Sequence, residues 1–431
     1  MLFLLGNREE AEVVLYNIGQ LVTMAGHTGK PVVHPSVESL GIVESKSGDL
    51  CVAGSGGEIV YMGRRSELHE ILGVGRAVEI DCKGKLVTPG FVDSHTHCIF
   101  AGSRENELSM KLAGMTYNEI LASGGGILKT VRDTRKAQDS EIISSTEKRI
   151  RSMRAFGTTT LEAKSGYALN LQGEIRLLEL LRRLKEKEEG FDIEPTLLSA
   201  HAIPEEYVGR NAQYISEVVL PSIDVCSNHT LSRFCDAFLE EGAFGFRDSE
   251  RILEYAQMKG LELKIHADEF SDQGGARLAA KMSCVSADHL GKASDEGIAA
   301  LAHSAVVAVL LPGTLLSSFV GTYARGREMI RSGVPVAIAT DLSPNSWIES
   351  MQFICSLACY GMKLTPEEAL VGATINGAHA ILRNNNVGSI EVGKYFDALI
   401  FDLNNYVQIP YMIGTNRVNK VLKQGKVVAE N

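Results

Sequence analysis

Short apolar runs alternate with amphipathic segments through the middle of the chain, from about residue 86 to residue 382. This alternation is typical of a parallel sheet whose strands are connected by helices. Eight strands are predicted, at residues 86–93, 158–163, 195–200, 234–239, 261–265, 283–287, 305–311 and 335–340. In residues 174–187, apolar side chains recur every three or four positions, as on the buried stripe of a helix. The pattern predicts an α/β fold, a TIM-like (β/α)8 barrel.

The two ends of the chain have a different pattern. Before residue 85 and after residue 383, short strand-like pieces are separated by glycines, with little sign of helix between them. The early pieces do not look like a complete domain, and the same pattern returns at the far end. We therefore expect a small β-sandwich built from residues 1–85 and 383–431, into which the barrel of residues 86–382 is inserted.

Polar side chains of the kind that bind metals follow several of the predicted strands. In a barrel of this type, active sites lie at the carboxyl ends of the strands. The first strand runs into His95 and His97, and residues two apart on a strand point to the same face. An His-x-His pair alone is a weak signal, but similar residues follow five other strands: Lys164 to Tyr167, His201, His266 to Glu269, Asp288 with His289, and Asp341.

These residues predict a metal-dependent hydrolase site. Its metal ligands would be His95, His97, His266 and Asp341. Imidazole nitrogen with carboxylate oxygen suits zinc or iron, and we expect one divalent metal ion per subunit. A metal of this kind lowers the pKa of a water molecule, so that hydroxide is available near neutral pH. Glu269 or Asp341 could act as general base, and His289 could orient or polarise the scissile carbonyl.

Lys164 has two possible interpretations. In some barrels a lysine at this place is carbamylated and bridges two metal ions. The Lys-Ser-Gly-Tyr context of Lys164 and the single aspartate after strand eight fit one metal better. We therefore expect Lys164 to be structural, or to lie next to the metal ligands.

Composition narrows the range of partners. The 431 residues are 45% hydrophobic and carry a net charge of -10, which argues against nucleic acid or an anionic membrane surface as the partner. An anionic substrate would need local arginines. The eight cysteines form no Cys-x-x-Cys pair, so we expect reduced, buried thiols in a cytoplasmic protein. The apolar residues 1–5 are too few for a signal sequence and are expected to form a first strand. No apolar run is long enough to span a bilayer.

Several motifs resemble those of the amidohydrolase superfamily and, within it, of the imidazolonepropionase family. The resemblance extends over nearly the whole chain and is carried by residues 89–97, 112–117, 124–128, 164–167, 200–204, 266–270, 286–290 and 311–314. The His-x-His motif is shared across the superfamily. The Gly-Gly-Gly-Ile-Leu, Lys-Ser-Gly-Tyr and His-Ala-Asp-Glu-Phe blocks are more specific to the imidazolonepropionase family.

The resemblance implies hydrolysis of 4-imidazolone-5-propanoate, a cyclic amide, to N-formimino-L-glutamate in histidine degradation. It implies a mononuclear zinc or iron site on the four ligands named above, and it suggests a homodimer. Arg104 and Tyr167 match positions that contact the substrate carboxylate and ring, and Tyr117 and His201 match other pocket positions. Glu269 and His289 match the residues that activate water and support the carbonyl.

One loop departs from the family pattern. The family commonly has Asp-x-Asn-Pro-Gly after strand eight, whereas this chain has Ser343 and Asn345 in place of the asparagine and the glycine, followed by Ser346. The metal ligand Asp341 is retained. The contacts that this loop makes with the substrate are therefore in question, with Ser343, Asn345 and Ser346 as the candidates.

Two other functions are compatible with parts of this pattern. A deaminase of the same superfamily, acting on a nucleobase or related amidine, would use the same ligands, but Arg104 with Tyr167 suits a carboxylate tail that a nucleobase lacks. A non-catalytic barrel that serves as a scaffold would typically have lost ligand residues, and none is missing here.

Overall fold

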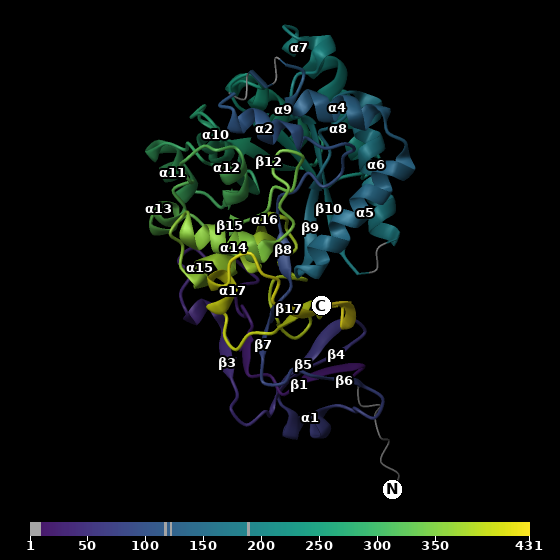
Figure 1. Cartoon of the computed structure of the whole chain (residues 1–431), viewed down its shortest axis with the longest axis vertical. Helices are drawn as coiled ribbons and strands as arrows, with labels where there is room; N and C mark the ends of the chain where they lie inside the picture. The colour runs from purple at the N-terminus through teal and green to yellow at the C-terminus, as the bar shows by residue number, and fades with distance from the viewer. Residues whose placement is uncertain (1–9, 116–118, 121–122, 188–189) are drawn as a thin grey trace.

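A computed structural model describes the whole chain except residues 1–9, 116–118, 121–122 and 188–189. The stretch 1–5, expected as a first strand, and the pocket candidate Tyr117 therefore lie outside the described residues. The middle of the chain forms the upper part of the molecule in Figure 1, and the purple and yellow ends lie together in the lower part.

The upper part is an eight-stranded parallel sheet that curves into a barrel. Its strands follow chain order: β8 (Phe91–Asp93), β9 (Thr158–Lys164), β10 (Asp192–Ala200), β11 (Phe234–Leu239), β12 (Glu262–Ala267), β13 (Ser286–His289), β14 (Val307–Leu310) and β15 (Val336–Ile338). Each of the eight predicted strands overlaps one of these, so the TIM-like barrel is confirmed. The strands are almost wholly buried, as expected for a parallel sheet covered by helices.

The barrel closes between its first and last strands. The main-chain N–H of His97 donates to the carbonyl of Leu342 at 2.9 Å, and that of Asp341 donates to the carbonyl of His95 at 3.1 Å. One step earlier, the buried Asp93 carboxylate accepts from the main chain of Thr340 at 3.0 Å. These bonds fix the carboxyl ends of β8 and β15 side by side.

The predicted first strand, residues 86–93, is in fact two strands. Its first half, β7 (Leu86–Pro89), pairs with the terminal segments, and only β8 belongs to the barrel. The break falls at Gly90, whose main-chain N–H donates to the carbonyl of Asp397 at 3.0 Å. A Cβ at Gly90 would lie 2.9 Å from the Cβ of Thr159 and closer still to its hydroxyl. The apolar pattern runs unbroken through this change of sheet, so it predicts one strand.

Two further sheets form the lower part of the molecule. A four-stranded sheet has the order β5 (Glu58–Arg64), β4 (Leu50–Ser55), β1 (Val13–Tyr16), β6 (Val78–Asp81), and a six-stranded sheet has the order β18 (Lys426–Glu430), β17 (Val418–Lys423), β16 (Ala398–Phe401), β7, β2 (Gln20–Val22), β3 (Ile42–Glu44). The second sheet combines strands from both ends of the chain, as expected. The exact division into residues 1–85, 86–382 and 383–431 stays a prediction.

Helices connect the strands and cover the outside of the barrel (Figure 1). Among the described residues, the α-helices are α1 (Arg65–Ile71), α2 (Asn106–Leu112), α4 (Gly126–Lys136), α5 (Asp139–Ala155), α6 (Leu171–Lys187), α7 (Asn211–Tyr214), α8 (Leu220–Asn228), α9 (Phe246–Met258), α10 (Gly275–Met282), α11 (Asp295–Ala302), α12 (Pro312–Ser317), α13 (Gly326–Arg331), α14 (Met351–Tyr360), α15 (Pro366–Gly372), α16 (Ile375–Ala380) and α17 (Gln408–Tyr411). The helix predicted at residues 174–187 is α6, which begins three residues earlier.

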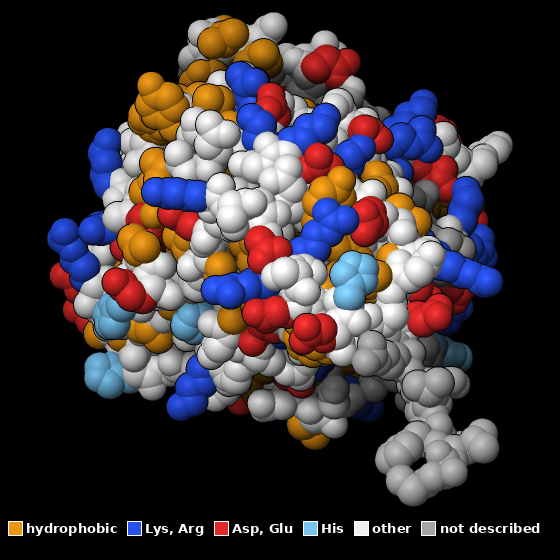
Figure 2. Space-filling model, turned by 90° about the horizontal axis from the view of Figure 1, so that it is seen from below, with side chains coloured by type: hydrophobic (Ala, Val, Ile, Leu, Met, Phe, Trp, Pro, Cys, Tyr) orange, Lys and Arg blue, Asp and Glu red, His pale blue; other side chains and the backbone are white. Residues whose placement is uncertain are grey.

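The surface seen from below mixes basic and acidic side chains (Figure 2). The excess of acidic groups, -10 in net charge, therefore does not gather into one acidic field on this face. Among the described residues, none of the helices is both long enough and apolar enough to cross a bilayer.

Replacing Gly90 with alanine should lower the free energy of unfolding by about 1–3 kcal/mol, because a methyl group is forced into a filled site. Urea unfolding measures the change. Gly29 provides the control, since it is exposed and has no atom within 4 Å of its Cβ position. Gly29→Ala should change the stability by less than about 0.5 kcal/mol. Equal stability of the two variants would contradict the packing account of the strand break.

Candidate active site

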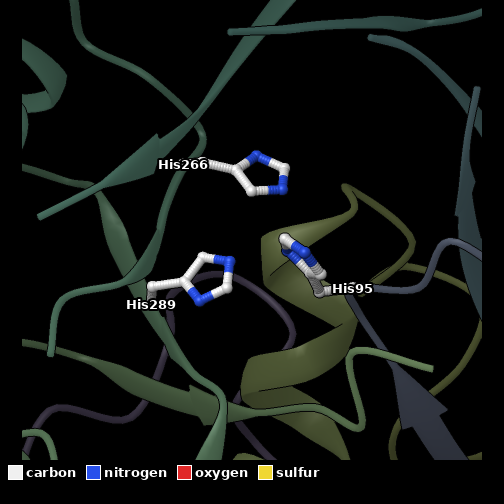
Figure 3. Close-up of side chains that lie close together, drawn as sticks. All are labelled: His95, His266 and His289. Atoms are coloured by element: carbon white, nitrogen blue, oxygen red, sulfur yellow. The ribbon is translucent and has the colours of Figure 1, made fainter. Parts of the chain in front are cut away.

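Three histidine rings from different strands face one another at the carboxyl end of the barrel (Figure 3). His95 follows β8, His266 lies in β12 and His289 ends β13. The ring centre of His95 is 4.6 Å from that of His266 and 5.3 Å from that of His289. Chain segments almost 200 residues apart thus place their imidazoles around a shared space.

The four predicted metal ligands lie together. One oxygen of Asp341, Oδ1, is 3.6 Å from His95 Nε2 and 3.5 Å from His97 Nε2. The Nε2 atom of His97 is 3.3 Å from the Nε2 atom of His266. The structure therefore groups donor atoms of His95, His97 and Asp341 within 4.8 Å of one another, and His266 adjoins this group through His97. The role of the four residues as metal ligands stays a prediction.

The surroundings of these histidines fit a bound cation. His95 Nδ1 lies 2.6 Å from Asp288 Oδ2, and His266 Nδ1 lies 3.0 Å from Asp236 Oδ2. A carboxylate on Nδ1 leaves the Nε2 lone pair available, as in many metal-bound histidines. His95 Nε2 is buried and has no hydrogen-bond partner among the described residues. Burial also lowers the pKa of His95 and His97 well below the ordinary value, which favours the neutral, metal-binding form.

Lys164 lies under this cluster. Its Nζ atom is 2.7 Å from Glu162 Oε1, 2.7 Å from Asp236 Oδ2 and 3.4 Å from Asp288 Oδ2. Burial alone would lower the pKa of Lys164, but the three carboxylates together raise it above its ordinary value. A carbamate forms on a neutral amine, so this charged lysine is unsuited to bridging two metal ions. Its position matches the expectation that it lies next to the ligands.

Asp341 uses its two oxygens differently. Oδ1 faces the histidines, and Oδ2 accepts a hydrogen bond from the hydroxyl of Thr314. Burial raises the pKa of Asp341 to about 6. Thr314 is the last residue of the motif at residues 311–314. The sequence alone does not indicate its role, because its contact with Asp341 depends on the packing of α12.

Glu269 and His289 form a second pair beside the cluster. Glu269 Oε2 lies 3.6 Å from His289 Nε2. Burial, and then the nearby carboxyl of Asp341, raise the pKa of Glu269 well above its ordinary value. The segment after Glu269 is held by the buried Glu240, which accepts from the main chain of Phe270 at 2.9 Å. A carboxylate directly after β11 thus fixes the loop that follows β12, a role that the sequence alone did not indicate.

Three residues at these strand ends have a left-handed backbone conformation. Asp268, His289 and Asp341 have φ values of +50°, +76° and +51°, a region that residues other than glycine rarely occupy. Asp268 offsets part of this strain, since its carboxylate accepts from the first main-chain N–H groups of α10, at Gly275 and Ala276. Strained residues in a structure often mark functional sites.

A pocket opens above the histidines. Of the predicted substrate contacts, six line it: Arg104, Tyr167, His201, Glu269, Ser343 and Asn345. Ser346 is buried and does not line the pocket, and Tyr117 lies outside the described residues. The structure adds Ile127, Phe238 and Phe270 to the wall. The pocket is thus apolar on part of its wall, with polar groups at fixed places.

His201 has a defined hydrogen-bonding state. Its ring stacks on that of His97 at a centroid distance of 4.9 Å, and its Nδ1–H donates to the carbonyl of Gly166 at 3.0 Å. Burial, and the nearby His266, lower the pKa of His201 to about 3, so the ring is neutral. Its Nε2 atom is therefore a hydrogen-bond acceptor.

The departure at Asn345 links two loops of the site. Asn345 Oδ1 accepts from Lys111 Nζ at 2.8 Å, and Asn345 Nδ2 donates to Ser318 at 3.2 Å. Lys111 also donates to the carbonyl of Ser317 at 3.2 Å. An asparagine where the family commonly has glycine therefore ties α2 to the end of α12 through this lysine.

Comparison with protein families and relatives agrees with this geometry. The profile of the amidohydrolase family matches residues 86–428. A protein of Alkaliphilus metalliredigens named imidazolonepropionase is 44% identical over 97% of this chain and 98% of its own length. A protein of the same name from Geobacillus kaustophilus is 44% identical over 96% of each chain.

Solved structures show the same fold at much lower identity. An adenosine deaminase from Xanthomonas campestris, with bound zinc, superposes with a TM-score of 0.70 at 19% identity, over 97% of this chain and 93% of its own. A 5-methylcytosine deaminase from Klebsiella pneumoniae gives a TM-score of 0.71 at 16% identity, over 97% and 98%. At such identities the likeness concerns the fold.

Asp288→Asn should weaken metal binding by about 10–100-fold, because the carboxylate that holds His95 Nδ1 is lost while the ligands remain. Competition with a chromogenic chelator measures the dissociation constant. Asp295→Asn is the control, since Asp295 is exposed and pairs only with Arg325 in the described part of the chain. An affinity equal to that of the unmodified protein would show that Asp288 does not support the site.

Proposed function

The chain belongs to the amidohydrolase family and, within it, to the imidazolonepropionases, and we propose that it hydrolyses 4-imidazolone-5-propanoate to N-formimino-L-glutamate. The main support is the convergence of His95, His97, His266 and Asp341 at the base of a pocket that also contains the Arg104 guanidinium. The first group of residues suits attack on a cyclic amide. The guanidinium suits the carboxylate tail of this substrate.

The pocket offers a partner for each polar part of the substrate. Arg104 can bind the propanoate tail. His201 Nε2, the acceptor of a neutral ring, can receive a ring N–H. Tyr167 lies beside His97 and His201, with ring-centre distances of 5.7 Å and 5.4 Å, and can pack against the heterocycle. These contacts would turn the ring carbonyl towards the histidine cluster.

The donor set is compatible with one divalent zinc or iron ion per subunit, held by His95, His97, His266 and Asp341. Such an ion, when bound, supplies Lewis-acid chemistry and lowers the pKa of a water molecule. Asp288 and Asp236 hold the outer nitrogens of His95 and His266 and keep their Nε2 atoms directed inward.

We assign proton transfer to Glu269. Asp341 is engaged through both oxygens, by Thr314 on one side and the histidines on the other, whereas one oxygen of Glu269, Oε2, lies 3.6 Å from His289 Nε2. As the oxygen of water bonds to the ring carbonyl carbon, its proton passes to a Glu269 carboxylate oxygen. The same carboxyl then gives a proton to the ring nitrogen as the C–N bond breaks. His289 lies beside it and can donate to the carbonyl oxygen as negative charge develops.

Purified protein should consume 4-imidazolone-5-propanoate and release N-formimino-L-glutamate. The loss of imidazolone absorbance measures the first, and mass spectrometry identifies the product. A chelator should stop the reaction, and Zn²⁺ or Fe²⁺ should restore it, because the ligand cluster cannot polarise the carbonyl alone. Release of ammonia from cytosine or guanine, with no reaction on the imidazolone, would instead favour a deaminase. A lack of transition metal and of both activities would favour a scaffold.

Glu269→Gln should lower kcat by about 10²–10⁴-fold, the usual range for loss of a positioned acid or base, while metal content is retained. Glu241→Gln, an exposed change nearby, is the control and should behave as the unmodified enzyme. Asp341→Asn should lose activity and metal together. The assignment would be reversed if Glu269→Gln kept substantial activity and Asp341→Asn, loaded with metal, had lost proton transfer.

A further inference from the structure

We propose that Glu107 is a positioning residue that fixes the Arg104 guanidinium in the pocket and thereby sets the selectivity for a ligand that carries a carboxylate. The proposal rests on the proposed function, because it takes the propanoate tail of the substrate as the ligand of Arg104. Neither the sequence motifs nor the reaction assigns a role to Glu107.

The two side chains form a buried, two-point ion pair. Arg104 Nε donates to Glu107 Oε1 at 2.9 Å, and Arg104 Nη2 donates to Glu107 Oε2 at 2.7 Å. Both side chains are only 5% exposed. A carboxylate bound in this way covers one edge of the guanidinium, the edge formed by Nε and Nη2. Within the described part of the chain, Nη1 has no protein partner, so the edge formed by Nη1 and Nη2 remains for a ligand.

A glycine-rich turn holds Glu107 from the other side. The main-chain N–H of Gly126, at the start of α4, donates to Glu107 Oε1 at 2.7 Å. Gly126 has a φ of +68°. A Cβ at Gly125 would lie 3.1 Å from Glu107 Oε1 and 2.9 Å from a methyl carbon of Ile120. The Gly-Gly-Gly-Ile-Leu block thus lets the backbone approach a buried carboxylate closely, which gives this motif a physical role.

The ion pair between Arg104 and Glu107 affects how the pocket selects an anionic ligand. Burial would raise the pKa of Glu107, but the hydrogen bonds from Arg104 and Gly126 and the Arg104 charge lower it below its ordinary value, so Glu107 is ionised at neutral pH. The positive charge of Arg104 is therefore already balanced. Selection then depends on the fixed direction of its free edge, because a restrained donor loses less conformational entropy when a ligand binds. The carboxyls of Glu269 and Asp341 in the same pocket disfavour an anion placed elsewhere.

Steady-state kinetics of Glu107→Gln, Arg104→Met and the double variant test this role. The amide introduced by Glu107→Gln would place an NH₂ group against the guanidinium donors, so Arg104 should lose its fixed direction. We expect Glu107→Gln to raise KM by about tenfold to a hundredfold, the range for a hydrogen bond to a charged group, with kcat nearly unchanged. If Glu107 acts only through Arg104, the double variant should be no worse than Arg104→Met. Additive losses in the double variant would overturn the proposal.

Glu105→Gln is the matched control. Glu105 is exposed on the same segment and hydrogen-bonds Ser103, so its variant should keep the KM of the unmodified enzyme. Metal content should also be unchanged in Glu107→Gln, whereas the thermal unfolding midpoint should fall, because one partner of a buried ion pair is removed. A loss of kcat together with metal would indicate general damage to the site and would contradict a positioning role.

Binding measurements separate this proposal from the proposed function. Calorimetry with imidazole-4-propanoate and with the uncharged imidazole-4-propanol should show that Glu107→Gln weakens only the carboxylate ligand, by at least about tenfold. Equal weakening of both ligands, or of neither, would overturn the proposal. An unmodified protein that binds the propanoate but does not open the imidazolone ring would overturn the proposed function and leave the role of Glu107 standing.

Discussion

The backbone that closes the barrel also assembles the candidate metal site. The hydrogen bonds between the segments that follow β8 and β15 run from the N–H of Asp341 to His95 and from the N–H of His97 to Leu342, so main-chain groups of three predicted ligands form the seam itself. The distance between the histidine pair and the Asp341 carboxylate is therefore set by closure of the sheet. A strand order that left the barrel open at this edge would also leave Asp341 remote from the imidazoles.

The interior beneath the site carries charge that is expensive to bury. Lys164 and Lys264 lie fully buried among Glu162, Asp236 and Asp288. Buried ions are tolerated when each is paired and hydrogen-bonded, and removing one partner leaves another uncompensated. Two of these carboxylates hold the outer nitrogens of His95 and His266, so the charge network is also the support that orients the ligands. Stability and site geometry are therefore coupled in this chain.

The sequence predicts the barrel and the inner ring of the site well, for physical reasons. Parallel strands that are covered on both faces have apolar side chains on both faces, so they form continuous apolar runs in the sequence. The predicted ligands lie where these runs end. The change of sheet at Gly90 cannot be recognised from the sequence, because β7 and β8 are both fully buried and follow one another as one apolar run. The supporting residues are missed for another reason: Thr314, Asp236 and Glu240 act through neighbours that are distant in sequence. A charged residue inside an apolar strand, as at Asp236, was the available signal.

The wall of the pocket was predicted less completely. Arg104 and Glu107, three residues apart, are compatible with an ordinary surface ion pair, and only their burial at the pocket distinguishes them. Asn345 could be recognised as a departure, but its link to Lys111 depends on how α2 packs on α12. Ser346 lies in the same loop but does not line the pocket. Its main-chain N–H and carbonyl are hydrogen-bonded to Ser343, which folds the loop back on itself.

Anomalous X-ray diffraction from crystals of the metal-loaded protein, recorded at the zinc and iron absorption edges, tests the central claim most directly. The account predicts one peak per chain, about 2.0–2.2 Å from the Nε2 atoms of His95, His97 and His266 and from Asp341 Oδ1. Two peaks bridged at Lys164, or a single peak from which Asp341 is excluded, would contradict it.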